Sequence, residues 1–133
     1  RLGAFCRFEN VQLKEERLYD EPSDAEIKNA LDKESEKILA EIPTRAFCIA
    51  MCVEGKQLSS EELADKLEAV SNQTSDVCFI IGSSFGLSDE IKRMSDFKFS
   101  MSKMTFPHKL ARIMLEEQIY RGFSISNNGK YHK

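Results

Sequence analysis

The stretch VCFIIGSSFG, residues 77–86, decides the fold expected of this chain. Its first five residues, Val77 to Ile81, form an apolar run of strand length, as expected for a strand buried on both faces. The chain then enters a turn punctuated by Gly82 and Gly86, where it must bend or let a ligand approach the backbone closely. A strand that leads directly into such a turn suits a nucleotide-binding α/β protein, although the turn alone is a weak sign of a ligand site.

Three other segments have strand character. Ala46 to Val53 is almost purely apolar and predicts a second buried strand, with Glu54-Gly55-Lys56 as its exit turn. Phe97 to Met101 predicts a short strand, and Phe5 to Leu13 predicts one of uncertain register.

Two capping boxes mark helix starts: Ser23 with Glu26, and Ser59 with Glu62. Pro43 ends the first of these helices. The apolar residues expected on one face of the first helix are Ile27, Leu31, Ile38, Leu39 and Ile42, and those of the second are Leu63, Leu67 and Val70.

Two further helices are expected in the second half of the chain. Ser88 can cap a short helix that runs to about Met94. Pro107 suits the first position of a helix that runs to about Arg121, and Gly122 suits its C-terminal exit.

Strands that alternate with helices predict a parallel sheet with helices on both faces, in which ligands gather beyond the carboxyl ends of the strands. The loops after Val53, Ile81 and Met101 are expected at that edge. A chain of 133 residues with 41% apolar composition is long enough for one domain, so residues 1–133 are expected to form a single domain.

The sequence contains neither an apolar run of about 20 residues nor a secretion signal, which favours a soluble, cytoplasmic protein with no membrane partner. The four cysteines lack zinc or redox spacing and are expected to be buried free thiols rather than two disulfides or a metal site. They are Cys6, Cys48, Cys52 and Cys78.

The charge distribution is uneven. The net charge of −3 does not by itself favour nucleic-acid binding, but the segment from Lys98 onward carries +5 and the part before it −8. The basic residues are Lys98, Lys103, Lys109, Arg112, Arg121, Lys130 and Lys133. They permit an anion-facing surface on this half of the chain; the alternative is that they are merely solvated near helix ends.

A more specific signal follows the glycine turn, whose G-x-x-x-G spacing is not the dinucleotide-binding fingerprint. The run SMSKMTFPH at residues 100–108 is followed by Glu117-Gln118-Ile119-Tyr120-Arg121 and by a closing Tyr131-His132-Lys133. In this order and spacing the residues resemble the RlmH family, SPOUT-class methyltransferases that act on a pseudouridine of large-subunit (23S) ribosomal RNA. The resemblance covers most of the chain and is strongest from Ile80 onward, which makes Val77 to His132 the expected working half.

The resemblance implies a C-terminal trefoil knot within about residues 77–133 that binds S-adenosylmethionine, a feature so rare that spacing alone would argue against it. It also implies a homodimer whose site is completed across the interface, and the assembled ribosome as substrate. The implied reaction moves a methyl group to N3 of the pseudouridine, and no metal takes part. The alternative is a non-catalytic α/β nucleotide-binding or ribosome-associated module.

The cofactor contacts implied by the resemblance lie at the same edge of the sheet. They are Met51, Gly82, Met101, Ser102, Lys103, Met104, Thr105 and Phe106. Apolar Met51, Met104 and Phe106 could flank adenine, with backbone groups near Gly82 taking its hydrogen bonds. For the two methionines the alternative is core packing.

Three residues are candidates for catalysis. His132 titrates near neutral pH and could be the base or an RNA contact, the alternative being a terminal histidine without a role. Arg121 could stabilise the imide anion or a phosphate, or offset the charge of a helix C-terminus. Tyr131 could stack on a base, close the site or anchor the tail, whereas His108 is expected to be structural.

The chain departs from the family pattern in two places. Ser83 stands where the family usually has a second glycine. The strand and helix with which family members begin have no counterpart before Arg1, and we expect that the sequence starts part-way through a gene product, because an unpaired strand would leave backbone groups without partners.

Overall fold

The computed structural model describes Leu13, Glu16 and residues 18–126. Most of the strand expected at Phe5 to Leu13 lies outside these residues, as do Cys6, Tyr131 and His132. The elements are α1 (Asp24–Glu41), β1 (Phe47–Gln57), α2 (Ser60–Ser71), β2 (Val77–Ile80), α3 (Asp89–Met94), β3 (Phe97–Ser100) and α4 (His108–Ser126).

The three strands form one parallel sheet with β1 in the centre, in the order β2-β1-β3. Ala50 of β1 lies beside Ile80 on one side and Lys98 on the other. The prediction of a parallel sheet built from strand–helix alternation is therefore confirmed.

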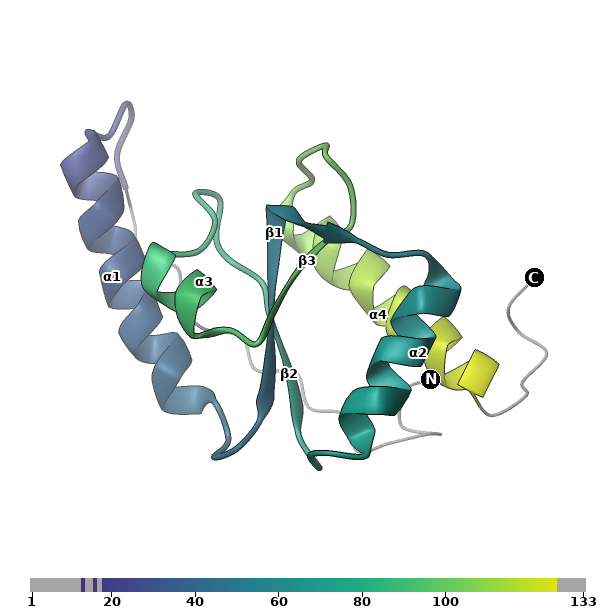
Figure 1. Ribbon diagram of the computed structural model, residues 1–133. Coiled ribbons are helices and arrows are strands. Elements are labelled where there is room, and N and C mark those ends of the chain that lie inside the picture. Colours follow the sequence, from purple (N-terminus) through teal and green to yellow (C-terminus); the bar gives the residue numbers. More distant parts are fainter. Residues whose placement is uncertain (1–12, 14–15, 17, 127–133) are drawn as a thin grey trace.

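Helices cover both faces of the sheet (Figure 1), with α1 and α3 on one side and α2 and α4 on the other. Two clusters of buried side chains correspond to these layers. The α2–α4 side holds Ile49, Leu63, Leu67, Phe99, Leu115 and Ile119. The α1–α3 side holds Cys48, Ala50, Ile80, Leu87 and Ile91, with Ile38 and Ile42 of the α1 segment packed against them.

Both capping boxes are formed as predicted. The Ser23 and Ser59 hydroxyls accept hydrogen bonds from the backbone N–H groups of Glu26 and Glu62, and both glutamates accept one in return. Each box satisfies two backbone donors that a helix start leaves unpaired, which fixes where α1 and α2 begin. Ser88 caps α3 in the same way, by accepting from the N–H of Ile91.

The predicted face of α1 is partly wrong. Ile38 and Ile42 reach the core, but Leu39 is exposed, and the buried residues of the helix are Ala30 and Ser35. Apolar periodicity does not identify a small polar residue such as Ser35 as part of a buried face.

The exit turn predicted at Glu54-Gly55-Lys56 is also wrong, because β1 continues through it to Gln57. Met51 and Lys56 both pair with Phe99, so the four residues between them form a bulge in the strand. A Cβ atom on Gly55 would lie 2.8 Å from backbone atoms of Lys98 and Phe99. Glycine is needed there because two backbones come close together.

Helix α4 begins one residue after Pro107 and continues to Ser126, past the end predicted at Arg121. Gly122 is therefore inside the helix, and its role as a C-terminal exit was wrongly predicted. It faces α2, where an added Cβ atom would lie 3.5 Å from Ala64 Cα and 3.5 Å from Leu67 Cδ1. The contact with α2 places Gly122 at a buried helix–helix interface, and the space there would also accept a Cβ atom.

We expect Gly122→Ala to stabilise the protein modestly. The new methyl group would make ordinary van der Waals contacts with α2, and alanine is favoured over glycine inside a helix by about 0.5–1 kcal/mol. Thermal unfolding should show a midpoint raised by a few degrees. A lower midpoint would mean that α2 and α4 cannot accommodate the methyl group.

Candidate functional site

Three segments leave the carboxyl edge of the sheet: the bulge of β1, the glycine loop (residues 81–88) after β2, and residues 101–107 after β3. In Figure 1 the glycine loop extends on the α3 side of β1 and residues 101–107 extend on the α4 side. The strand register aligns Met51 with Phe99, and Ala50 with Ile80. Gly82 and Met101 each lie two residues beyond their aligned positions. Because neighbouring strands are about 4.8 Å apart, the three loops begin within roughly 10 Å of one another across the sheet.

The glycine loop is a tight turn held by its own backbone. The N–H of Gly86 donates to the carbonyl of Ser83 at 2.9 Å, and Gly86 has a φ of 84°. A Cβ atom on Gly82 would overlap the Gly86 carbonyl group and lie 2.9 Å from the Leu87 nitrogen. Gly82 is therefore required for the close backbone approach and Gly86 for its left-handed conformation.

Two serine hydroxyls order the loop after β3. Ser100, which is buried, donates to the carbonyl of Ser102 at 2.8 Å, and the Ser102 hydroxyl accepts from the N–H of Met104 at 3.0 Å. Ser102 was predicted as a cofactor contact, but the supporting role of Ser100 was missed. The sequence signal for Ser100 was its position at the end of a predicted strand.

The predicted cofactor residues differ in burial. Met51 and Met101 are half-buried and pack against the core cluster of the α2–α4 side. Met51 therefore has core contacts, and its contact with a cofactor stays a prediction. Met104 is 70% exposed, so the core-packing alternative is wrong for Met104. Phe106 is half-buried, and Lys103 and Thr105 are exposed.

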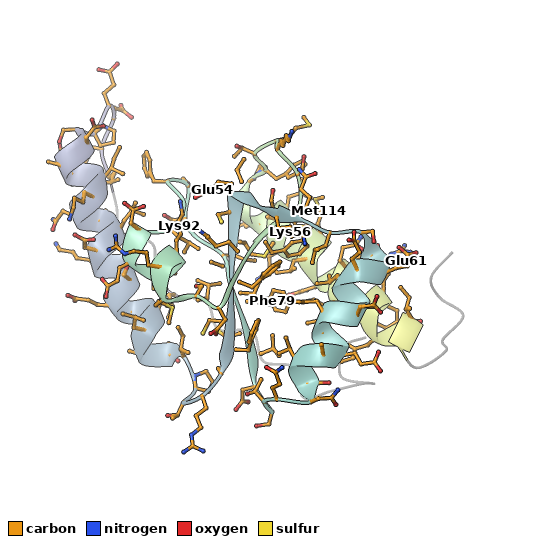
Figure 2. All side chains as sticks on the ribbon, viewed as in Figure 1. Glu54, Lys56, Glu61, Phe79, Lys92 and Met114 are labelled. Carbon is orange, nitrogen blue, oxygen red and sulfur yellow. The ribbon has the colours of Figure 1, made fainter. Side chains whose placement is uncertain are left out.

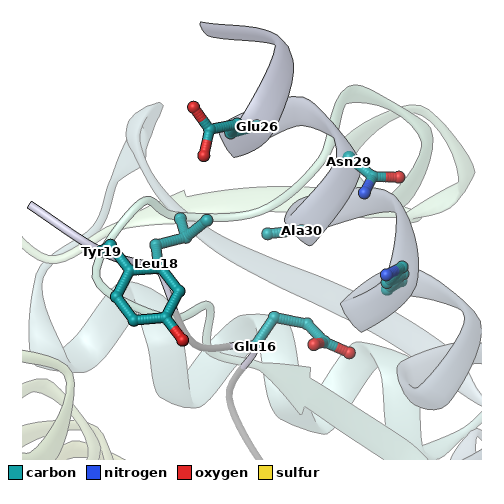
Figure 3. Close-up of a pocket in the computed structure, with 7 residues that line it drawn as sticks. Glu16, Leu18, Tyr19, Glu26, Asn29 and Ala30 are labelled. Carbon is teal, nitrogen blue, oxygen red and sulfur yellow. The ribbon is translucent and has the colours of Figure 1, made fainter. Parts of the chain in front are cut away.

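A cavity of 280 Å³ lies between the start of α2, the end of β3 and α4. Its lining residues are Leu58, Ser59, Ser60, Leu63, Phe99, Met101, Met114 and Gln118. Met101 connects it to the loop after β3, and Met114 projects from α4 (Figure 2). A second cavity, of 190 Å³, lies between α1 and the segment around Tyr19 (Figure 3) and includes none of the predicted site residues.

An ion pair that the sequence did not reveal lies beside the edge. Lys92 Nζ of α3 is 2.5 Å from Glu54 Oε1 in the β1 bulge (Figure 2). The hydrogen bond from Lys92 holds the pKa of the Glu54 carboxyl below its usual value. These residues are 38 positions apart, so no local pattern could pair them.

The basic charge of α4 is partly compensated within the helix. Arg121 Nε lies 3.4 Å from Glu117 Oε1, and Arg112 Nε lies 4.0 Å from Glu116 Oε1. The helix continues for more than a turn beyond Arg121, so the alternative that this residue offsets the charge of a helix C-terminus is wrong.

The described cysteines are free thiols, as predicted. Burial raises the pKa of Cys48, Cys52 and Cys78, which keeps these thiols protonated and unreactive at neutral pH.

Within Leu13, Glu16 and residues 18–126, no group of His, Cys, Asp and Glu side chains could hold a metal ion. None of the helices in that part of the chain is both long and apolar enough to cross a membrane.

The residues at the edge fit a nucleoside ligand with a charged tail. An exposed thioether and a half-buried phenyl ring, Met104 and Phe106, can contact a flat base. The exposed Lys103 side chain can pair with a carboxylate, and residues 84–86 of the glycine loop are exposed. S-adenosylmethionine has these chemical parts, so the residue types at this edge of the sheet match its chemistry.

Comparison with known proteins identifies the class first. A family model described as "Predicted SPOUT methyltransferase" matches residues 1–132, and the chain belongs to this family of methyltransferases. The predicted resemblance is thus confirmed.

Individual relatives carry a more specific name, "Ribosomal RNA large subunit methyltransferase H". Proteins so named are similar to the whole chain, at 46% identity in Streptococcus thermophilus (strain CNRZ 1066), 44% in Ligilactobacillus salivarius (strain UCC118) and 43% in Clostridioides difficile (strain 630). Each alignment covers 100% of this chain and 84% of the relative.

Proposed function

We propose that this chain transfers a methyl group from S-adenosylmethionine to N3 of a pseudouridine in large-subunit ribosomal RNA, on the assembled ribosome. The observation that carries the proposal is the similarity, over the whole chain, to large-subunit ribosomal RNA methyltransferases. The strand register supports it as well, because the β1 bulge, the glycine loop and the loop after β3 all begin at one edge of the sheet.

The cofactor supplies the methyl group and the sulfur leaving group in a single in-line displacement. The glycine loop and the loop of residues 101–107 have to hold the donor so that the methyl carbon lies within near-attack distance of the nucleophile. The internal hydrogen bonds of Ser83 with Gly86, and of Ser100 with Ser102, suit this task because they set loop shape before any ligand arrives.

The acceptor is an imide nitrogen, which must lose its proton before or during attack. His132 is the candidate base, since a neutral imidazole is available at physiological pH. Arg121, half-buried on α4, could stabilise the imide anion or bind a phosphate, and Tyr131 could stack on the RNA.

The proposal includes a homodimer and a trefoil knot within about residues 77–133, and a cytoplasmic location with the ribosome. Two large apolar side chains of α4 support the dimer, because Leu110 is 45% exposed and Ile113 is 56% exposed. They lie three residues apart and hence on the same side of the helix. An apolar strip of this kind is better covered by a second copy than left in water.

Calorimetric titration tests the cofactor part of the proposal. We expect S-adenosylmethionine, or its demethylated product, to bind with one site per subunit. Absence of binding in an intact dimeric preparation would contradict the proposal and favour a non-catalytic module.

The substrate is tested by mass spectrometry of the target nucleotide after incubation with isotopically labelled cofactor. We expect methylation of assembled ribosomes that contain pseudouridine, and little methylation of naked RNA. Equal labelling of an RNA that carries uridine at the target would contradict the assignment of pseudouridine.

A further inference from the structure

Two adjacent residues of α1 contact both ends of the glycine loop. The Ser83 hydroxyl, at the start of the loop, donates to Glu34 Oε1 at 2.9 Å. The Ser88 hydroxyl, at its end, is hydrogen-bonded to the Ser35 hydroxyl. The segment that contains Gly82 is therefore tied to a helix about 50 residues earlier in the chain.

The direction of the hydrogen bond between Ser35 and Ser88 follows from the other partners of the two hydroxyls. Ser35 donates its single proton to the carbonyl of Leu31 at 2.8 Å, so Ser88 must be the donor to Ser35. The Ser88 oxygen at the same time accepts from the N–H of Ile91, at 3.2 Å. Both serines are almost completely buried, so a broken link would leave the Ser88 hydroxyl proton without this acceptor in a site that excludes water.

The Glu34 carboxylate is itself held on both oxygens. Its Oε2 accepts from the backbone N–H of Glu16 at 2.9 Å, while Oε1 accepts from Ser83. The Glu16 side chain returns to α1 as an ion pair with Lys37, with 2.9 Å between Oε1 and Nζ. Glu34 consequently presents a fixed acceptor to the loop, and a hydrogen bond to a charged acceptor is stronger than a neutral one.

This contact has a direct consequence for a ligand at the loop. The Ser83 carbonyl accepts the hydrogen bond that closes the turn onto Gly86, and that turn brings Gly82 against the Gly86 carbonyl group. A side chain that fixes Ser83 also fixes the backbone groups that a ligand would meet. A loop held in its binding conformation does not lose conformational entropy when the ligand binds.

We propose that Glu34 is a positioning residue for the cofactor, which it does not touch, and that it acts through the hydroxyl of Ser83 to hold the glycine loop in its binding conformation. The inference rests on the proposed function, because it requires S-adenosylmethionine to bind at this loop. The inference also gives the Ser83 side chain a role, because a glycine at this position could not donate a hydrogen bond to Glu34.

A double-mutant cycle tests the inference on the full-length chain. Glu34→Ala and Ser83→Ala should each weaken S-adenosylmethionine binding about tenfold by calorimetry, equivalent to about 1.4 kcal/mol. The double variant should be no weaker than either single variant, because both remove the same hydrogen bond. KM for the cofactor should rise in parallel, while kcat at saturating cofactor should change less than twofold.

Two further variants separate positioning from general support of the fold. Glu34→Gln keeps one oxygen that can accept from Ser83, but its NH2 group cannot accept from the backbone N–H of Glu16, so it should recover only part of the affinity. Glu36→Ala removes an exposed glutamate from the same helix and should bind like the wild type.

The outcomes are distinguishable. Failure of the wild-type chain to bind the cofactor overturns the proposed function, and this inference with it. Wild-type binding that Glu34→Ala and Ser83→Ala leave unchanged overturns the inference alone, as do losses that multiply in the double variant.

Discussion

Gly82→Ala is expected to lower kcat/KM for methyl transfer by at least about 100-fold. The new methyl group would overlap the carbonyl group of Gly86 and approach the Leu87 nitrogen to 2.9 Å, so the backbone of the loop must move. A shift of about 1 Å in a group that positions a reactant can cost about 10²-fold in rate. Steady-state kinetics and calorimetric titration with S-adenosylmethionine would measure the loss.

Gly122→Ala provides the matched control, because it makes the same chemical change where the added atom has only ordinary contacts. It should leave both kcat/KM and cofactor affinity within about twofold of the wild type. Overpacking at Gly82 should also reduce the free energy of unfolding, by about 1–3 kcal/mol. A Gly82→Ala protein with wild-type affinity and rate would show that the loop has no part in cofactor binding.

His132→Ala is expected to reduce methyl transfer by about 10²–10⁴-fold, the usual contribution of a general base. The affinity for S-adenosylmethionine should remain within about twofold, since the proposed role concerns the RNA nitrogen. Single-turnover methylation of ribosomes, with calorimetry in parallel, separates the two quantities. A parallel fall in both would assign His132 to the fold or to the cofactor site instead.

The pH dependence sharpens this prediction. A base acts in its neutral form, so the wild-type rate should fall as the pH drops through the histidine pKa, near 6.5 for an unperturbed imidazole. His132→Ala should lose this dependence. His108→Ala, which changes the chain's other histidine, should retain it together with most of the rate.

Helix starts were predictable because their determinants are local. A capping box needs two side chains three residues apart, and both boxes at Ser23 and Ser59 are formed as the sequence indicated. Helix ends were less predictable. Gly122 resembles a C-terminal signal, yet α4 continues past it to Ser126, and the helix packs against Ala64 of α2 at this position.

The features of the candidate site that belong to a sequence motif could be predicted. Those that depend on contacts between distant residues could not. The run from Ser100 to His108 led to the correct family. The bulge of β1 could not be foreseen, since the pairing of both Met51 and Lys56 with Phe99 depends on the register of a strand more than 40 residues away. Likewise, nothing near Glu54 announces its ion pair with Lys92.

The sequence by itself determined the order of the elements, the start of each capped helix, the parallel character of the sheet and the methyltransferase family. Those properties depend on residues within a few positions of one another or on an ordered motif. Only the tertiary structure decided that β1 continues past Met51 through a bulge opposite Phe99, and that Glu34 meets Ser83 across 49 residues. Such contacts arise from the register of strands and the packing of helices, which hold together residues that the chain keeps far apart.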